Sequence, residues 1–144
     1  ADLSGADCSR MSFSSAGLHR SRFIRTILRE ASLAQSRCIG GVFTHADFTA
    51  ANLISTELTG CELSEAVFLR AQMPDLRLSR CNLASADLRE IRAESSEWRR
   101  VNADGARLDG AHLSRSSLSR VSLVGAQLTG VQAQQVDFSE VDLS

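Results

Sequence analysis

Apolar residues recur at every fifth position along the chain. Counting in fives from Leu3 to Leu143 meets 29 residues, and every one of them is apolar. Sixteen of these repeat centres are Leu, and six are Phe, which accounts for every Phe in the chain. Two residues before each centre stands a second position that is usually small or apolar, and it is Ala twelve times. The pattern therefore predicts two inward side chains in every five residues.

A period of five fits neither an uninterrupted helix nor an uninterrupted strand. Five residues turn a helical side chain by about 500°, so the apolar positions would wind around the helix instead of facing one core. In a strand, side chains five residues apart point to opposite faces. Short extended pieces joined by regular corners keep all the apolar side chains in one interior. We therefore predict an all-β coil around a common axis.

Four or three such pieces can complete one coil, which gives coils of 20 or 15 residues. A spacing of 20 places Gly105 over Gly125 and Gly110 over Gly130, so we favour the square coil. Glycine readily adopts the positive φ that a corner may require. Seven of the nine glycines stand at the last position of a repeat: Gly5, Gly40, Gly60, Gly105, Gly110, Gly125 and Gly130.

Individual repeats follow the pattern A-(D/N)-L-x-x. Typical copies are ADLSG at residues 1–5, ADFTA at 46–50, ANLIS at 51–55 and ADLRE at 86–90. Over essentially all 144 residues, this pattern resembles the pentapeptide-repeat family. The resemblance implies a right-handed quadrilateral parallel β-helix, a solenoid of about seven 20-residue coils here. We expect residues 1–144 to be one domain and a fragment of a longer chain, because the repeat is already under way at Ala1.

Several unusual residues fall on inward positions. We expect Trp98 to pack in the core, because the neighbouring centres Ala93 and Ala103 leave room for an indole. Three large residues at the small position are also expected inside: Met11, Leu76 and Ile91. The four cysteines, expected to be buried and reduced, are Cys8, Cys38, Cys61 and Cys81. The three His fall in different columns and no C-x-x-C occurs, so we expect no metal site and no cofactor.

The charge of the chain is nearly balanced. Sixteen basic residues, all of them Arg, face seventeen acidic ones, and the formal net charge is −1. No bulk field therefore points to nucleic acid, and we expect no direct nucleic-acid binding. No run of apolar residues is long enough for a membrane span. The absence of Lys suggests a bacterial source. We expect a cytoplasmic location, with export or injection as an effector as the alternative.

Outward residues 20 positions apart should stack as columns. One column alternates in sign through Arg37, Glu57, Arg77 and Glu97. Further opposite charges one coil apart are Arg10 and Glu30, Arg70 and Glu90, and Arg89 and Asp109. We expect these columns to form ladders of surface ion pairs, each contributing about 0–1 kcal/mol.

Two groups of outward residues are candidate contacts for a partner protein of unknown identity. They are Arg80, Arg99, Arg100 and Arg120 in the first group, and Ile24, Ile27, Ile39 and Val42 in the second. Like charges one coil apart repel, so a partner carboxylate or phosphate would suit the first group. The alternative is solvated Arg near Glu97 and Glu140. The second group gathers apolar side chains around one face, whereas scattered apolar surface residues would need no partner.

The C-terminal end of the repeat is apolar. Its side chains include Val136, Phe138, Val141 and Leu143. An uncovered coil presents unpaired backbone groups as well as this apolar cross-section. We therefore expect an adjoining segment to cover at least one end, and residues 1–144 alone to form an end-to-end homodimer.

The sequence offers no arrangement typical of catalysis. It contains no glycine-rich phosphate loop, no nucleophile elbow and no inward pair of carboxylates, so we expect no enzyme. The favoured function is a non-catalytic scaffold or protein-recognition rod, as a module of a bacterial effector or secretion-associated protein. The alternative follows from a resemblance to the quinolone-resistance proteins, which imitate DNA and bind type II topoisomerases. Such mimicry requires a strongly negative surface, whereas acids and Arg alternate here.

Overall fold

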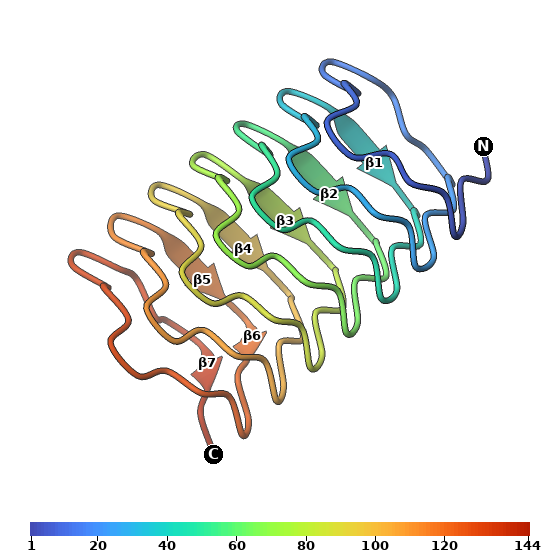
Figure 1. Ribbon diagram of the computed structural model, residues 1–144. Coiled ribbons are helices and arrows are strands. Elements are labelled where there is room, and N and C mark those ends of the chain that lie inside the picture. The colour runs from blue at the N-terminus through green and yellow to red at the C-terminus, as the bar shows by residue number, and fades with distance from the viewer.

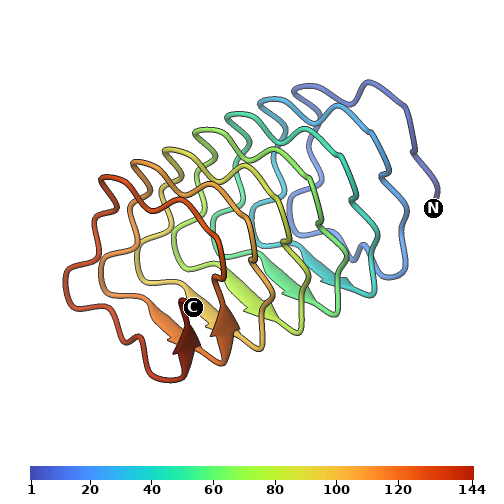
Figure 2. The ribbon, with the colours of Figure 1, turned by 90° about the horizontal axis from the view of Figure 1, so that it is seen from below.

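The chain forms a parallel β-solenoid in which each coil lies on the previous one. The computed structural model describes residues 1–144, and Figures 1 and 2 show the coils stacked from the N-terminus to the C-terminus. Each β-bridge joins residues 20 positions apart, from Asp2↔Arg22 to Ser117↔Asp137. The offset of 20 confirms the 20-residue coil and excludes the 15-residue one. No helix that could cross a membrane is present.

One face of the solenoid carries a regular five-stranded parallel sheet. Its strands follow the order of the chain: β1 (Arg37–Ile39), β2 (Glu57–Thr59), β3 (Arg77–Ser79), β4 (Glu97–Arg99) and β5 (Ser117–Ser119). A separate two-stranded sheet pairs β6 (Val121–Ser122) with β7 (Val141–Asp142). In every pair the register places a residue opposite the one 20 positions later, as in Leu78↔Trp98.

The main sheet marks about five turns, fewer than the seven expected from the sequence. Three-residue strands pair without interruption only between Arg37 and Ser119. Outside that stretch the coils are joined mainly by single bridges with the same 20-residue offset. The repeat therefore continues, but the continuous strand pairing does not.

Every repeat from Gly5 to Glu140 ends in a residue with positive φ. The seven glycines expected at corners have φ between 59° and 73°, which confirms that prediction. The other corners hold 21 residues that are not glycine, with Arg100 at 53° as an example. Coil-to-coil hydrogen bonds hold these less favourable backbones in place, as when the Arg100 amide donates to the Ser119 carbonyl at 2.9 Å. The corner geometry thus follows from the repeat, and glycine only lowers its cost.

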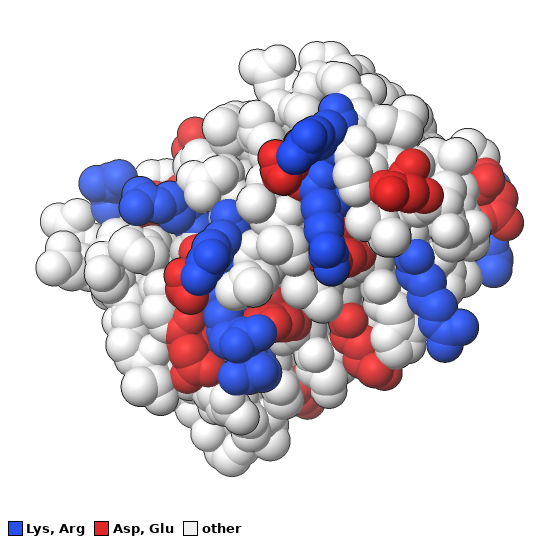
Figure 3. Space-filling model, in the orientation of Figure 1, with Lys and Arg blue, Asp and Glu red and all other residues white.

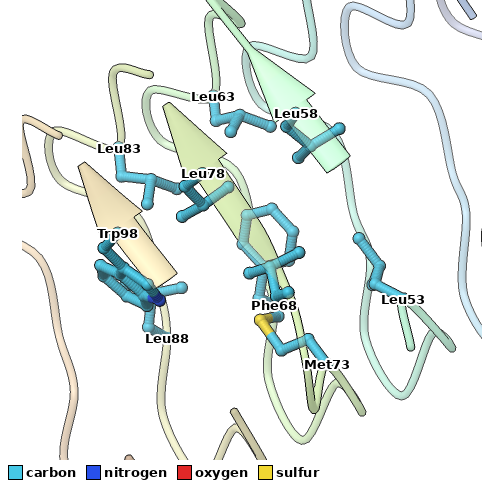
Figure 4. A pocket seen from close by; sticks show the side chains of 10 residues that line it. Leu53, Leu58, Leu63, Phe68, Met73, Leu78, Leu83, Leu88 and Trp98 are labelled. Carbon is cyan, nitrogen blue, oxygen red and sulfur yellow. The ribbon is translucent and has the colours of Figure 1, made fainter. Parts of the chain in front are cut away.

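The interior is filled by the repeat centres and the small residues before them. Thirty-seven buried apolar residues form one core cluster. In Figure 4, Leu58 and Leu63 lie beside Leu78 and Leu83 of the next coil, around a void of about 10 Å³. Aromatic rings also stack from coil to coil, with the Phe48 and Phe68 ring centroids 4.7 Å apart. This arrangement confirms the inward assignment of the five-residue pattern.

Trp98 is fully buried, as expected, and its polar edge is satisfied. Its indole Nε1 donates to the Ser96 hydroxyl at 3.0 Å, and that hydroxyl lies 3.0 Å from the Ser116 hydroxyl. Ser116 in turn donates to the Ala93 carbonyl at 2.9 Å. The repeat thus supplies a short buried chain of hydroxyl groups beside the only indole. The five-residue pattern indicated the burial but not this hydrogen-bond chain.

The other residues predicted to point inward are buried in the middle of the rod but not all of them at its N-terminal end. Leu76 and Ile91 are buried, as expected, but Met11 is 48% exposed. The expectation for Met11 was wrong because only one side of its coil is covered by another coil within residues 1–144. All four cysteines are buried and carry free thiols. Burial raises the pKa of the Cys8 thiol, which disfavours the reactive thiolate.

Candidate functional site

A polar groove lies over the C-terminal edge of strands β3–β5. It has a volume of about 500 Å³ and no hydrophobic residue in its lining. Its walls bring together all four arginines that the sequence placed in one group. The lining residues are Ser79, Arg80, Arg99, Arg100, Ser119, Arg120 and Glu140.

The sheet register positions the middle of this arginine groove. Ser79, Arg99 and Ser119 end their strands and are neighbours in the ladder. Adjacent paired strands lie about 4.8 Å apart, so the distance from Ser79 to Ser119 is roughly 10 Å. Their side chains alternate with those of the strand centres, which point into the core. Strand geometry therefore presents one guanidinium between two hydroxyl groups.

The corners that follow the strands supply the remaining arginines. Arg80, Arg100 and Arg120 each follow the last residue of a strand and have φ of 54°, 53° and 56°. The same backbone conformation repeats in successive coils, so the three side chains form a column. Glu140 occupies the next place in that column. The sequence spacing of 20 alone was sufficient to find this arrangement.

Only one arginine of the groove has a carboxylate partner. Arg120 Nε lies 2.7 Å from Glu140 Oε2 and donates a hydrogen bond to it. The guanidinium groups of Arg80, Arg99 and Arg100 make no ion pair with any carboxylate of the chain within 4.0 Å. Glu97, which the sequence places nearby, forms no ion pair with these three arginines. The groove therefore carries three positive charges that the chain leaves unbalanced.

Elsewhere the predicted ladders of ion pairs are largely confirmed. Glu57 lies between Arg37 at 3.3 Å and Arg77 at 3.4 Å, although Glu97 does not extend this ladder. Two other expected pairs, Arg10 with Glu30 at 3.4 Å and Arg70 with Glu90 at 3.0 Å, are also formed. Figure 3 shows the outcome on one face of the molecule, where positive and negative side chains are interspersed.

The predicted pairing of Arg89 with Asp109 was wrong. Arg89 folds back on Asp87 in its own repeat, with guanidinium and carboxylate 2.6 Å apart. Asp87 already accepts the backbone N–H of Arg89 at 3.2 Å, which holds the carboxylate close to its partner. The hydrogen bonds from Arg89 keep the pKa of Asp87 below its usual value. Arg89 thus pairs with Asp87, two residues away, instead of with Asp109 in the next coil.

A family comparison explains why one repeat pattern extends through the entire chain. The family model for pentapeptide repeats matches eight copies, over residues 1–29, 26–64, 43–84, 77–115, 99–132 and 106–144. The chain belongs to the pentapeptide-repeat family.

Solved structures show the same fold. A trypsin-treated form of QnrB1, a plasmid-mediated fluoroquinolone resistance protein, aligns with a TM-score of 0.69 and 21% identity. That alignment covers 98% of this chain and 89% of QnrB1. Full-length QnrB1 gives a TM-score of 0.62 and 19% identity, over 100% and 94% of the two chains. At this identity the likeness concerns the pentapeptide-repeat fold alone. No curated protein sequence matches the chain.

The second candidate group of this pentapeptide-repeat protein is partly exposed. Ile27 and Ile39 are 38% and 46% exposed, whereas Ile24 and Val42 are half-buried. A β-bridge joins Val42 to Arg22, which lies two residues before Ile24. None of the four residues lines a pocket. The group therefore offers apolar surface without a cavity.

The C-terminal coil of the pentapeptide-repeat solenoid presents an apolar hollow of about 300 Å³. Phe138 and Leu143 contribute to its lining and are 44% and 59% exposed. Val136 and Val141, the other two residues of this candidate contact, are half-buried and pack against the core cluster. No three or more His, Cys, Asp or Glu side chains of the chain lie where they could hold a metal ion.

Proposed function

We propose that this chain is a non-catalytic rod that recognises another protein through its outward side chains. The observation that carries the proposal is the arginine groove, where three guanidinium groups lack a carboxylate partner. Two other columns of the same solenoid balance Arg with Glu one coil away. Like charges at this spacing repel, and an anionic partner relieves that repulsion. Arg80, Arg99, Arg100 and Arg120 are therefore the proposed contact.

The chemistry of the groove supports binding rather than catalysis. Ser79 and Ser119 are the only hydroxyl groups in the lining, and no His accompanies them. The one carboxylate, that of Glu140, is held by Arg120. A nucleophilic serine needs a neighbouring base to accept its proton, and this groove does not supply one. Placement in a bacterial effector or secretion-associated protein, in the cytoplasm or after export, remains a prediction.

A site-specific photo-crosslinker tests the recognition proposal in cells of the source organism. We place it at Ser119 in the groove and, as the matched control, at Arg115, the exposed last residue of the preceding repeat. The expected result is one crosslinked protein at Ser119, absent at Arg115 and lost after Arg99→Glu with Arg100→Glu. Ile39 serves as a second crosslinking position. If neither Ser119 nor Ile39 gives an adduct, the recognition function is contradicted.

The second candidate is DNA mimicry toward a type II topoisomerase, favoured by the fold shared with QnrB1. The arginine groove and the balanced ladders argue against it, because a mimic of DNA must present unneutralised negative charge. The protein is therefore expected to leave DNA supercoiling by gyrase unchanged. Potent inhibition, or protection of gyrase from a quinolone, would restore the mimic as the better proposal.

End-to-end association is a separate prediction about residues 1–144. Phe138 and Leu143 expose apolar surface that a second copy would cover. We expect light scattering to show a dimer, and Phe138→Asp to shift it toward monomer, because a charge in an apolar contact is costly. Ser139→Asp, next in sequence but outside the apolar hollow, is the control. A monomer at high concentration would contradict the prediction.

A further inference from the structure

We propose that the arginine groove binds an extended acidic peptide whose carboxylates are two residues apart. The inference rests on the proposed recognition function and names the chemistry of the segment that is recognised. Arg80, Arg99 and Arg100 would hold the carboxylates, and the hydroxyl groups of Ser79 and Ser119 would donate hydrogen bonds to the peptide.

Other outward arginines of the solenoid bind carboxylates. Arg120 holds the Glu140 carboxylate from the next coil at 2.7 Å, and Arg70 holds that of Glu90 at 3.0 Å. In each case the acid stands one place further along the same column. One place beyond Arg80 the column holds Arg100 instead of an acid. The groove is therefore a run of ion-pair sites in which the acidic half is missing.

The length of the groove suits a short extended segment. From Ser79 to Ser119 it spans two coil spacings, roughly 10 Å. An extended chain rises about 3.3 Å per residue, so carboxylates two residues apart are separated by about 7 Å on the same side. Two such carboxylates fit within the span, and each lies within reach of a flexible guanidinium. A peptide of the pattern acid–x–acid thus occupies the groove along the solenoid axis.

The lining argues against stacked nucleic-acid bases and hydrophobic anchors, and it gives the groove a direction. It holds no aromatic residue on which a nucleic-acid base would stack, and no apolar pocket for a hydrophobic anchor. At the far end, the Glu140 carboxylate repels a further acid. The carboxylates of the peptide are therefore expected on the side of Arg80 and Arg100, with a neutral or basic residue toward Glu140.

Fluorescence anisotropy tests the inference with the 144-residue chain and a labelled peptide. The probe is Gly-Asp-Gly-Asp-Gly with blocked termini, and its Asn-containing counterpart is the control peptide. We expect the Asp peptide to bind at low salt and to weaken as salt rises, because exposed ion pairs are screened. Equal binding of both peptides would overturn the proposal, and so would tighter binding of inorganic tripolyphosphate at the same site.

Three variants separate the groove from general charge. Arg99→Gln combined with Arg100→Gln should weaken binding at least tenfold. Arg20→Gln is the matched control, because Arg20 has the same column position and φ of 53° but is followed one coil later by Gly40. It should leave affinity unchanged, whereas an equal loss would overturn the site. Glu140→Gln should raise affinity about two- to fivefold by releasing Arg120.

The two proposals fail in different ways. If the Asp peptide does not bind but the crosslinker at Ser119 still captures a partner in cells, recognition stands and the acidic-peptide chemistry is wrong. If no outward position captures a partner, the recognition function itself is wrong, whatever the peptide does in vitro. Circular dichroism of each variant confirms that the solenoid is folded.

Discussion

Replacing Gly41 with Ala is expected to destabilise the solenoid, although Ala is the commonest residue at this position of the repeat. A Cβ atom on Gly41 would overlap Cys38 Sγ and would lie 2.8 Å from Cε2 of Phe43. Both approaches are closer than a van der Waals contact, so the thiol or the ring must move. Gly41 is not among the glycines with positive φ, so the conflict is one of space rather than of backbone conformation.

Neither neighbour of Gly41 can move freely. Cys38 is fully buried, and its thiol donates to the Leu18 carbonyl at 2.8 Å. The Phe43 ring stacks on Phe23 with centroids 5.0 Å apart. Overpacking of a filled core costs about 1–3 kcal/mol. The smaller entropy of the unfolded chain returns about 0.4–1 kcal/mol for Gly→Ala, so a net loss remains.

Urea unfolding of a double-mutant cycle measures this conflict. Cys38→Ala removes the thiol, and in that background Gly41→Ala should cost less than in the parent, because only the contact with the Phe43 ring remains. The two substitutions should therefore couple by about 1–3 kcal/mol. If Gly41→Ala is equally destabilising with and without Cys38, the thiol does not occupy the space below Gly41 and the reasoning fails.

Three further predictions test the core and the surface. Leu83→Ala should lower the free energy of unfolding by about 2–5 kcal/mol because the stacked core collapses only partly around a cavity, while Arg115→Ala should change it little; equal losses in urea would contradict the inward and outward assignments. Ser96→Ala should cost about 1–3 kcal/mol by leaving the Trp98 indole N–H unpaired, and the same change in a Trp98→Phe background should cost less when measured by chemical unfolding. The pKa of Asp87 is held low by Arg89, so its contribution to stability is present above the unfolded-state pKa and disappears as pH falls through the folded-state value. Asp87→Asn should therefore lose less stability than the parent between pH 7 and pH 3, and identical losses would argue against the Asp87–Arg89 contact.

The features that sequence alone predicted are those set by the repeating backbone. Once the coil length is 20, the register of Leu78 with Trp98 and the positive φ of Gly105 follow from counting. Each depends on the position of a residue in the repeat and not on its rotamer. The same counting indicated the column of Arg80 and Arg100. Backbone periodicity therefore determined the fold and the place of the candidate site together.

The features that sequence did not predict depend on competition between nearby partners. Arg89 had one acid two residues before it and another one coil away, and counting could not rank the two. Likewise, the pattern allows Ala at position 41, but the orientation of the Cys38 thiol decides whether a Cβ fits there. Long or polarisable side chains have several arrangements within a few ångströms. Their contacts follow from packing in three dimensions rather than from the period of the sequence.

This difference explains why the arginine groove stands out from the remaining surface. In two other columns, a coil offset of 20 turns a sequence alternation of Arg and Glu into adjacent opposite charges, as in Arg37 with Glu57 and Arg70 with Glu90. The same offset turns Arg80, Arg100 and Arg120 into adjacent like charges. An arginine with an acid within reach forms an ion pair inside the chain. Of the three arginines in this column, only Arg120 has such an acid. The fold imposes the same offset of 20 on every column. The unbalanced charge therefore results from the residue types at positions 80, 99 and 100, and those arginines can still bind an external anion.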